Sequence, residues 1–111
     1  MRIINRTTKP IRILDIDGNA HTFPPVGPPV TLQYDVEGEV FQGFNIRRYI
    51  PVGVNHLPPM DEDILYVVAA VVARYVKRAD LLAANTFHGA VRNEQGRIYA
   101  TSGFEAFDEP V

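Results

Sequence analysis

Residues 64–76 read ILYVVAAVVARYV and contain the longest apolar run of the chain, from Ile64 to Ala73. Two structures suit this stretch. One is a single buried helix that begins after Asp61-Glu62-Asp63, because acidic side chains favour the positive end of a helix dipole. The other is a strand from Ile64 to Val68 that leads into a short helix from about Ala69 to Lys77. The β-branched residues favour the strand followed by a helix, but hydrophobic periodicity alone does not separate the two structures.

The sequence before this run predicts β-structure. Short β-branched runs at residues 2–5 and 11–16 are typical of strands, and Asp17-Gly18-Asn19 separates the second run from residues 20–23. Asp-Gly between two such runs predicts a hairpin, since both residues tolerate a positive φ.

The next part predicts a proline-rich connection and a second hairpin. Four prolines lie in residues 23–29, which we expect to form an ordered loop or an edge, because proline cannot donate a backbone hydrogen bond. Residues 30–36 and 40–49 predict two strands that turn at Glu37-Gly38-Glu39. Residues 53–59 predict the break that follows.

The last third of the chain predicts one more hairpin. Residues 80–85 suit another helical turn, and 88–92 and 97–100 suit two strands around Asn93-Glu94-Gln95-Gly96. Residues 104–107 extend this hairpin. We therefore expect a single α+β domain over residues 1–111, with a mostly antiparallel sheet and one or two short helices.

Composition excludes several classes of protein. The chain of 111 residues has no cysteine, which excludes disulfides, thiolate metal sites and a cysteine nucleophile. The formal net charge of −2 gives no uniform basic field for duplex nucleic acid. No metal site or cofactor is predicted.

We expect neither a signal peptide nor a membrane segment. Residues 1–6 are not followed by an apolar stretch of the kind that signal peptides carry. The apolar run from Ile64 is about half the roughly 20 residues that a membrane-spanning helix needs.

Arginines and aromatic residues give the candidate ligand site. Arg92 and Arg97 flank the last predicted turn, and an anion between them would offset their repulsion if they are cross-strand neighbours. Phe87, Tyr99 and Phe104 lie near them in the sequence. Arginine forks match phosphate oxygens and aromatic faces stack on bases, so this set suits a ligand with a phosphate and a base.

Several short segments, in their order and spacing, resemble a family of small proteins common in phage genomes. The segments are NRTTKPI (5–11), DGN (17–19), FPPVG (23–27), LPP (57–59), LYVVA (65–69), RADL (78–81) and VRNEQGRI (91–98), followed by Phe104. The chain departs from the family pattern at Thr8-Lys9, Val26, Ala69 and Asn93, where the family has Pro-His, Ser, Ser and Asp. This family is similar in turn to the phage Thoeris anti-defence sponges of the first type.

The resemblance implies a sponge that binds cyclic ADP-ribose signals without cleaving them, in the cytoplasm of the infected bacterial host. Some sponges also hold cyclic oligonucleotides of the CBASS system, and the family forms homo-oligomers, as dimers or hexamers, with an α+β fold. On this basis Phe87 or Phe104 stacks on the adenine and Arg92 with Arg97 holds the pyrophosphate. Asn93 reads a ribose hydroxyl or a base edge. Arg47 or Arg48 lines a second site near a symmetry axis.

Two other functions remain open from the sequence. The first is a phosphodiesterase-like enzyme acting on similar nucleotides, with a metal held by Asp61, Asp63 or Asp80 together with His88. The second is a phage structural or host-interaction protein without a small-molecule ligand, because proline-rich loops and edge strands also suit contacts between proteins.

Overall fold

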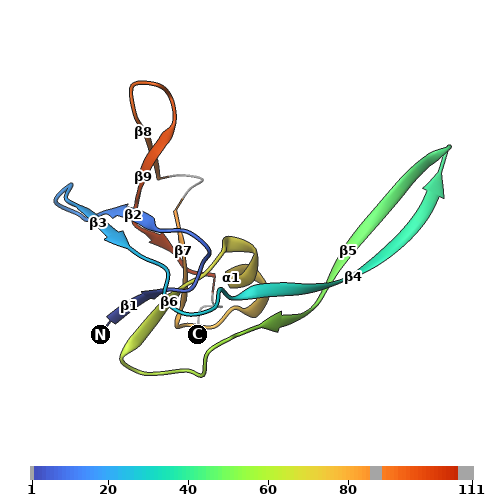
Figure 1. Cartoon of the computed structure of the whole chain (residues 1–111), viewed down its shortest axis with the longest axis horizontal. Helices are drawn as coiled ribbons and strands as arrows, with labels where there is room; N and C mark the ends of the chain where they lie inside the picture. Colours follow the sequence, from blue (N-terminus) through green and yellow to red (C-terminus); the bar gives the residue numbers. More distant parts are fainter. Residues whose placement is uncertain (1, 86–88, 108–111) are drawn as a thin grey trace.

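The computed structural model describes residues 2–85 and 89–107, which form strands and one helix (Figure 1). The elements are β1 (Arg2–Asn5), β2 (Ile11–Leu14), β3 (Ala20–Phe23), β4 (Thr31–Phe41), β5 (Phe44–Asn55), β6 (Ile64–Val67), α1 (Ala70–Val76), β7 (Leu81–Ala84), β8 (Ala90–Arg92), β9 (Ile98–Ser102) and β10 (Phe104–Glu105). The expected α+β class is confirmed in its coarse form, although strand predominates. None of the helices in the described residues is long and apolar enough to cross a bilayer.

The apolar run at 64–76 forms a strand and then a helix. Strand β6 ends at Val67, and α1 begins at Ala70 after Ala69, whose extended backbone (φ −60°, ψ 145°) forms the N-cap. The helix carries the chain back across the sheet, so β7 pairs with β6 in parallel. The helical turn expected over residues 80–85 is wrong. Leu81 and Ala83 are buried on one face of β7, and this alternation is typical of a strand.

Two four-stranded sheets form the body of the molecule. One has the order β1-β6-β7-β10 and the other β3-β2-β9-β8. The pairs β1–β6, β6–β7 and β2–β9 are parallel, and the other pairs in these two sheets are antiparallel. The sheets are therefore mixed rather than mostly antiparallel. Local turn signals predict hairpins, but parallel pairs join strands that are distant in the sequence.

The core lies where α1 and the loop before β4 pack on the first sheet. Its buried residues come from β6, α1 and β7, together with Val30 and Val68 from the connections. Leu32 and Val54, at the roots of β4 and β5, pack against this core. The hydrophobic core thus uses only the first residues of the long hairpin.

The hairpin of β4 and β5 extends from the body as an arm, defined here as residues 31–55 (Figure 1). Its turn is Gln42-Gly43, with φ values of 52° and 82°, and not the expected 37–39. Two consecutive positive φ values make the tight turn that suits strand twist, and Gly38 instead pairs with Arg47 inside the ladder. The Cα radius of gyration is 16.5 Å, against about 13 Å for a compact domain of this length.

Candidate functional site

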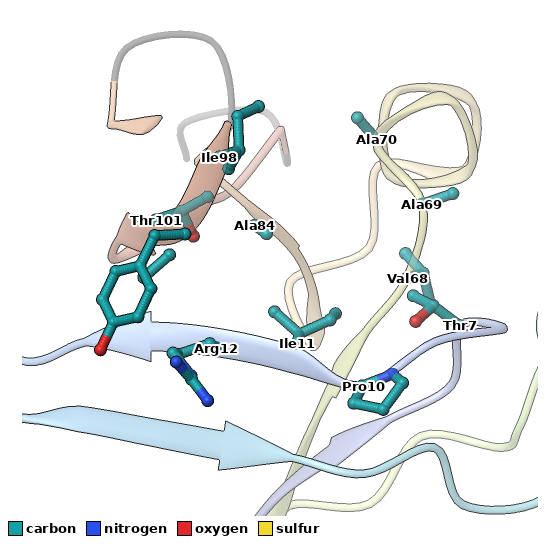
Figure 2. A pocket seen from close by; sticks show the side chains of 12 residues that line it. Thr7, Pro10, Ile11, Arg12, Val68, Ala69, Ala70, Ala84, Ile98 and Thr101 are labelled. Atoms are coloured by element: carbon teal, nitrogen blue, oxygen red, sulfur yellow. The ribbon is translucent and has the colours of Figure 1, made fainter. Parts of the chain in front are cut away.

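A pocket of about 400 Å³ opens between the two sheets, beside the start of α1 (Figure 2). Figure 2 shows Ile98 and Thr101 on one side, Val68 and Ala70 on the other, and Ile11 between them. The complete lining is Thr7, Pro10, Ile11, Arg12, Val68, Ala69, Ala70, Ala84, Ile98, Tyr99, Ala100 and Thr101. Its volume lies in the range of small-molecule sites, which are mostly apolar with a few placed polar groups.

Asn5 builds the loop that carries Thr7 and Pro10 to the pocket. Its side chain is 1% exposed, and its amide nitrogen donates to the carbonyls of Lys9 and Phe23, each at 2.8 Å. Its Oδ1 accepts from the Thr7 backbone N–H at 2.9 Å and from the Thr7 hydroxyl at 2.6 Å. The Asn5 side chain thus uses both its amide nitrogen and its amide oxygen in hydrogen bonds. These bonds fix the loop against β3, because breaking any of them would leave a buried polar group unpaired.

Arg12 and Tyr99 place a cation and an aromatic ring together at the pocket. The guanidinium carbon of Arg12 lies 4.8 Å from the centroid of the Tyr99 ring. A cation over an aromatic face is attracted by the ring quadrupole, and the stacked guanidinium keeps its N–H donors in the plane for an anion. The two residues therefore form a preorganised surface for a planar or negatively charged group.

Thr101 has a buried hydroxyl beside the same pocket. The residue is 4% exposed, and its Oγ1 has no hydrogen-bond partner among the described residues. Leaving a buried hydroxyl unpaired costs roughly 1–3 kcal/mol. Thr101 is one of the lining residues, but the hydroxyl oxygen itself has almost no accessible surface, so it is an unpaired polar group of the fold beside the pocket and not a contact that the pocket offers to a ligand.

The lining combines apolar walls with few polar groups. Among its twelve residues, all in the described part of the chain, Arg12 and Tyr99 carry the ionisable side chains. Isoleucine and alanine side chains can cover a flat ring, and the guanidinium can pair with a phosphate. The Thr7 hydroxyl donates to Asn5 Oδ1 and can still accept a hydrogen bond from a ligand hydroxyl. This chemistry favours binding of an anionic, ring-containing molecule.

The structure places three predicted site residues at the turn between β8 and β9. The side-chain oxygen of Asn93 accepts from the backbone N–H groups of Gln95 at 3.0 Å and Arg97 at 3.1 Å. Arg92 pairs across the ladder with Ile98, not with Arg97, and its guanidinium donates to the Gly96 carbonyl at 2.8 Å. Arg92 and Arg97 are therefore not cross-strand partners, since a bulge shifts the register at this point, and the condition for an anion between them as such a pair is not met.

The other predicted ligand residues lie in different parts of the molecule. The Phe104 ring packs edge-on against Phe23, with centroids 6.0 Å apart, in a second, apolar pocket of about 390 Å³. Phe87 lies outside the described residues.

Arg47 and Arg48 lie on the arm. Arg48 donates twice to Glu39 Oε1, at 2.9 and 2.6 Å, whereas Arg47 points to the opposite face beside Gly38 and Val40. The arm projects from the body on the side away from the β8–β9 hairpin (Figure 1). The arginines of these two hairpins do not converge within one chain.

Two of the three carboxylates of the enzyme hypothesis, those of Asp61 and Asp80, have local structural partners. Asp61 Oδ1 accepts from the Asp63 backbone N–H at 2.9 Å in the turn before β6. Asp80 is buried and accepts from Arg78 at 2.7 and 2.6 Å, and this hydrogen bonding raises the pKa of the Arg78 guanidinium. His88 lies outside the described residues, among which no three His, Asp or Glu side chains gather to hold a metal.

Sequence reasoning missed Arg12 and Thr101 as pocket residues, and it noted Tyr99 without assigning it a role. Arg12 and Tyr99 meet only because β2 and β9 pair in parallel, and no local signal predicts that pairing. Comparison with known proteins adds no assignment: no family model, curated protein or solved structure matches this chain. Function is therefore inferred from the chemistry of the pocket and from the resemblance of the short segments.

Proposed function

We propose that this protein is a binding protein that sequesters a cyclic nucleotide signal without cleaving it, as phage anti-defence sponges do. The ligand class is the cyclic ADP-ribose isomers, with cyclic oligonucleotides as a second class. The protein would act in the cytoplasm of the infected bacterial host and as a homo-oligomer. The observation that carries the proposal is the mainly apolar pocket whose lining includes the Arg12–Tyr99 stack.

The pocket supplies the interactions that such a ligand needs. A pyrophosphate requires fixed N–H donors, which the stacked guanidinium of Arg12 offers. A base requires a flat apolar or aromatic surface, which Tyr99 and Ile98 offer. Ribose hydroxyls require polar partners, and the hydroxyl of the lining residue Thr7 retains lone pairs that can accept from them.

The segments that resemble the phage family support the same pocket. Three of them contribute to its lining: residues 5–11 through Thr7, Pro10 and Ile11, residues 65–69 through Val68 and Ala69, and residues 91–98 through Ile98. A fourth segment, residues 78–81, forms the buried Arg78–Asp80 pair. The resemblance and the pocket thus involve overlapping parts of the chain.

A sponge must bind tightly enough to deplete its ligand. Nanomolar binding corresponds to about −12 kcal/mol, and only preorganised contacts reach it with few polar groups. Removing a stacking aromatic costs roughly 1–3 kcal/mol, which is about a 5- to 150-fold loss of affinity. Tyr99→Ala should therefore weaken binding within that range.

A capture-and-release assay tests the proposal. The purified protein is mixed with cyclic ADP-ribose isomers and cyclic di- and trinucleotides, free ligand is removed by filtration, and the protein is heat-denatured. Chromatography of the supernatant should recover intact nucleotide near one equivalent per pocket. A linearised product would indicate the enzyme instead, and no retained nucleotide would favour a phage structural or host-interaction protein.

Substitutions locate the site. Arg12→Gln should reduce retention, and Arg2→Gln, a matched change of an exposed arginine on β1, should not. The pair Arg92→Gln and Arg97→Gln tests the β8–β9 turn separately. If those two changes abolish retention and Arg12→Gln does not, the ligand binds at the turn and not in the pocket.

A further inference from the structure

The arm exposes an apolar face that continues outward from the hydrophobic core. On β4, Leu32 packs on the core, and the residues at every second position beyond it share its face. These residues are Tyr34, Val36, Gly38 and Val40, and their cross-strand partners on β5 are Pro51, Tyr49, Arg47 and Asn45. We call this surface the apolar arm face.

The opposite face of β4 is polar. Between the same apolar positions lie Gln33, Asp35, Glu37 and Glu39. Their partners on β5 include Arg48, opposite Glu37, whose guanidinium bonds diagonally to Glu39, and the apolar residues Ile50 and Ile46, opposite Asp35 and Glu39. Strict alternation of apolar and polar residues is typical of a strand that buries one face. No other part of the described chain covers the apolar arm face, since the side chains on it remain exposed: Val36 is 55%, Tyr49 59% and Val40 71% exposed.

An isolated two-stranded ribbon of this kind is marginally stable in water. The Tyr34 and Tyr49 rings, with centroids 6.2 Å apart, give the apolar arm face one aromatic contact of its own. The rest of the arm beyond Leu32 and Val54 gains little from the core. A partner that covers the apolar arm face would supply the burial that the arm otherwise lacks.

We infer that the apolar arm face is a homo-oligomer interface, on which a second copy of this chain packs in a reciprocal exchange of arms. Eight residues from Tyr34 to Phe41 span about 27 Å, and two strands are about 10 Å wide, so one arm face covers about 270 Å². Two exchanged arms, each covering an equal area of the other copy, bury about 1,100 Å² in total. This reaches the size of a specific interface, whereas one arm on an unrelated protein would bury half as much.

This inference is independent of the nucleotide, because the interface is measured without ligand. The first test is the mass of the purified protein in solution by light scattering and sedimentation at micromolar concentration. We expect an oligomer with an even number of chains. A monomer at these concentrations would overturn the inference.

Matched variants on neighbouring positions of β4 and β5 locate the interface. The double variant Val36→Lys with Tyr49→Lys places two charges on the apolar arm face and should raise the dissociation constant at least about a hundredfold. Asp35→Lys introduces the same side chain next to Val36 but on the polar face, and should leave assembly unchanged. Equal effects of the two changes would refute an interface on the apolar arm face.

The absence of cysteine from the chain allows a milder test that does not depend on lysine tolerance. Val36→Cys and Asp35→Cys each carry a single thiol, and both native side chains are exposed in one chain. In the oligomer, the thiol at position 36 should be exposed only in dissociated chains. It should therefore react with a water-soluble thiol reagent at least about tenfold more slowly than the thiol at position 35. Equal rates at high protein concentration would contradict a covered face.

Discussion

Replacing Asn5 by alanine removes four hydrogen bonds that join β1 to the pocket loop and to β3. Three backbone groups lose their partner: the carbonyls of Lys9 and Phe23 and the N–H of Thr7. At about 1 kcal/mol for each of these three backbone groups, we expect the free energy of unfolding to fall by about 3 kcal/mol. For a chain of this size, about 4 °C per kcal/mol gives a melting temperature lower by about 12 °C.

Urea unfolding followed by circular dichroism measures this change, with Asn45→Ala as the control. Asn45 is exposed on the arm, so its replacement should change the free energy of unfolding by less than about 0.5 kcal/mol. Because the Asn5 network also positions Thr7, the Asn5 variant should lose nucleotide retention at temperatures where it is still folded. A loss of stability below about 1 kcal/mol would refute the assignment of Asn5 as the anchor of this loop.

Three further changes have defined outcomes. Ala69→Ser supplies the side-chain cap that α1 lacks and should raise the free energy of unfolding by about 1 kcal/mol. The melting temperature should then be higher by about 4 °C, and an unchanged melting temperature would contradict a capping role for this position. Thr101→Val removes the unpaired buried hydroxyl and should leave the free energy of unfolding equal or higher in urea unfolding. A loss above about 1 kcal/mol would show that the hydroxyl has a partner. The pKa of Asp15 is lowered by its 2.7 Å hydrogen bond with His21, so an NMR titration should give a midpoint below 3.8. The stabilisation by this carboxylate, measured against Asp15→Asn, should be fully present above pH 3.8 and disappear as the pH falls through the lowered pKa.

Local turn chemistry made much of the fold predictable. Asp15 and Gly18 form the expected turn before β3, with the Asp15 carboxylate accepting from the backbone N–H groups of Asp17 and Asn19 at 2.9 Å. The turn at Asn93 follows the same logic. The arm was mispredicted because glycine at position 38 resembles a turn residue, whereas Gln42 gives no comparable signal for its positive φ.

The candidate site was less predictable than the fold. The proposed roles of Arg92, Asn93 and Arg97 rested on the family resemblance and on proximity in the sequence, and these residues do share one turn. The pocket, however, combines residues from β2, β9 and the start of α1 that no spacing rule connects. Arg12 gave no signal as a single arginine in a short strand.

The sequence by itself determined the strand-forming runs and two of the three hairpin turns, because propensity and turn chemistry act over a few neighbouring residues. For residues 64–76 it left both a single helix and a strand followed by a helix open. Only the tertiary structure decided which strands pair in parallel, since those contacts join distant segments through the short helix α1. That pairing stacks Arg12 on Tyr99 and buries the hydroxyl of Thr101. It also leaves the alternating pattern of β4 facing solvent beyond Leu32, because the core of one chain ends there.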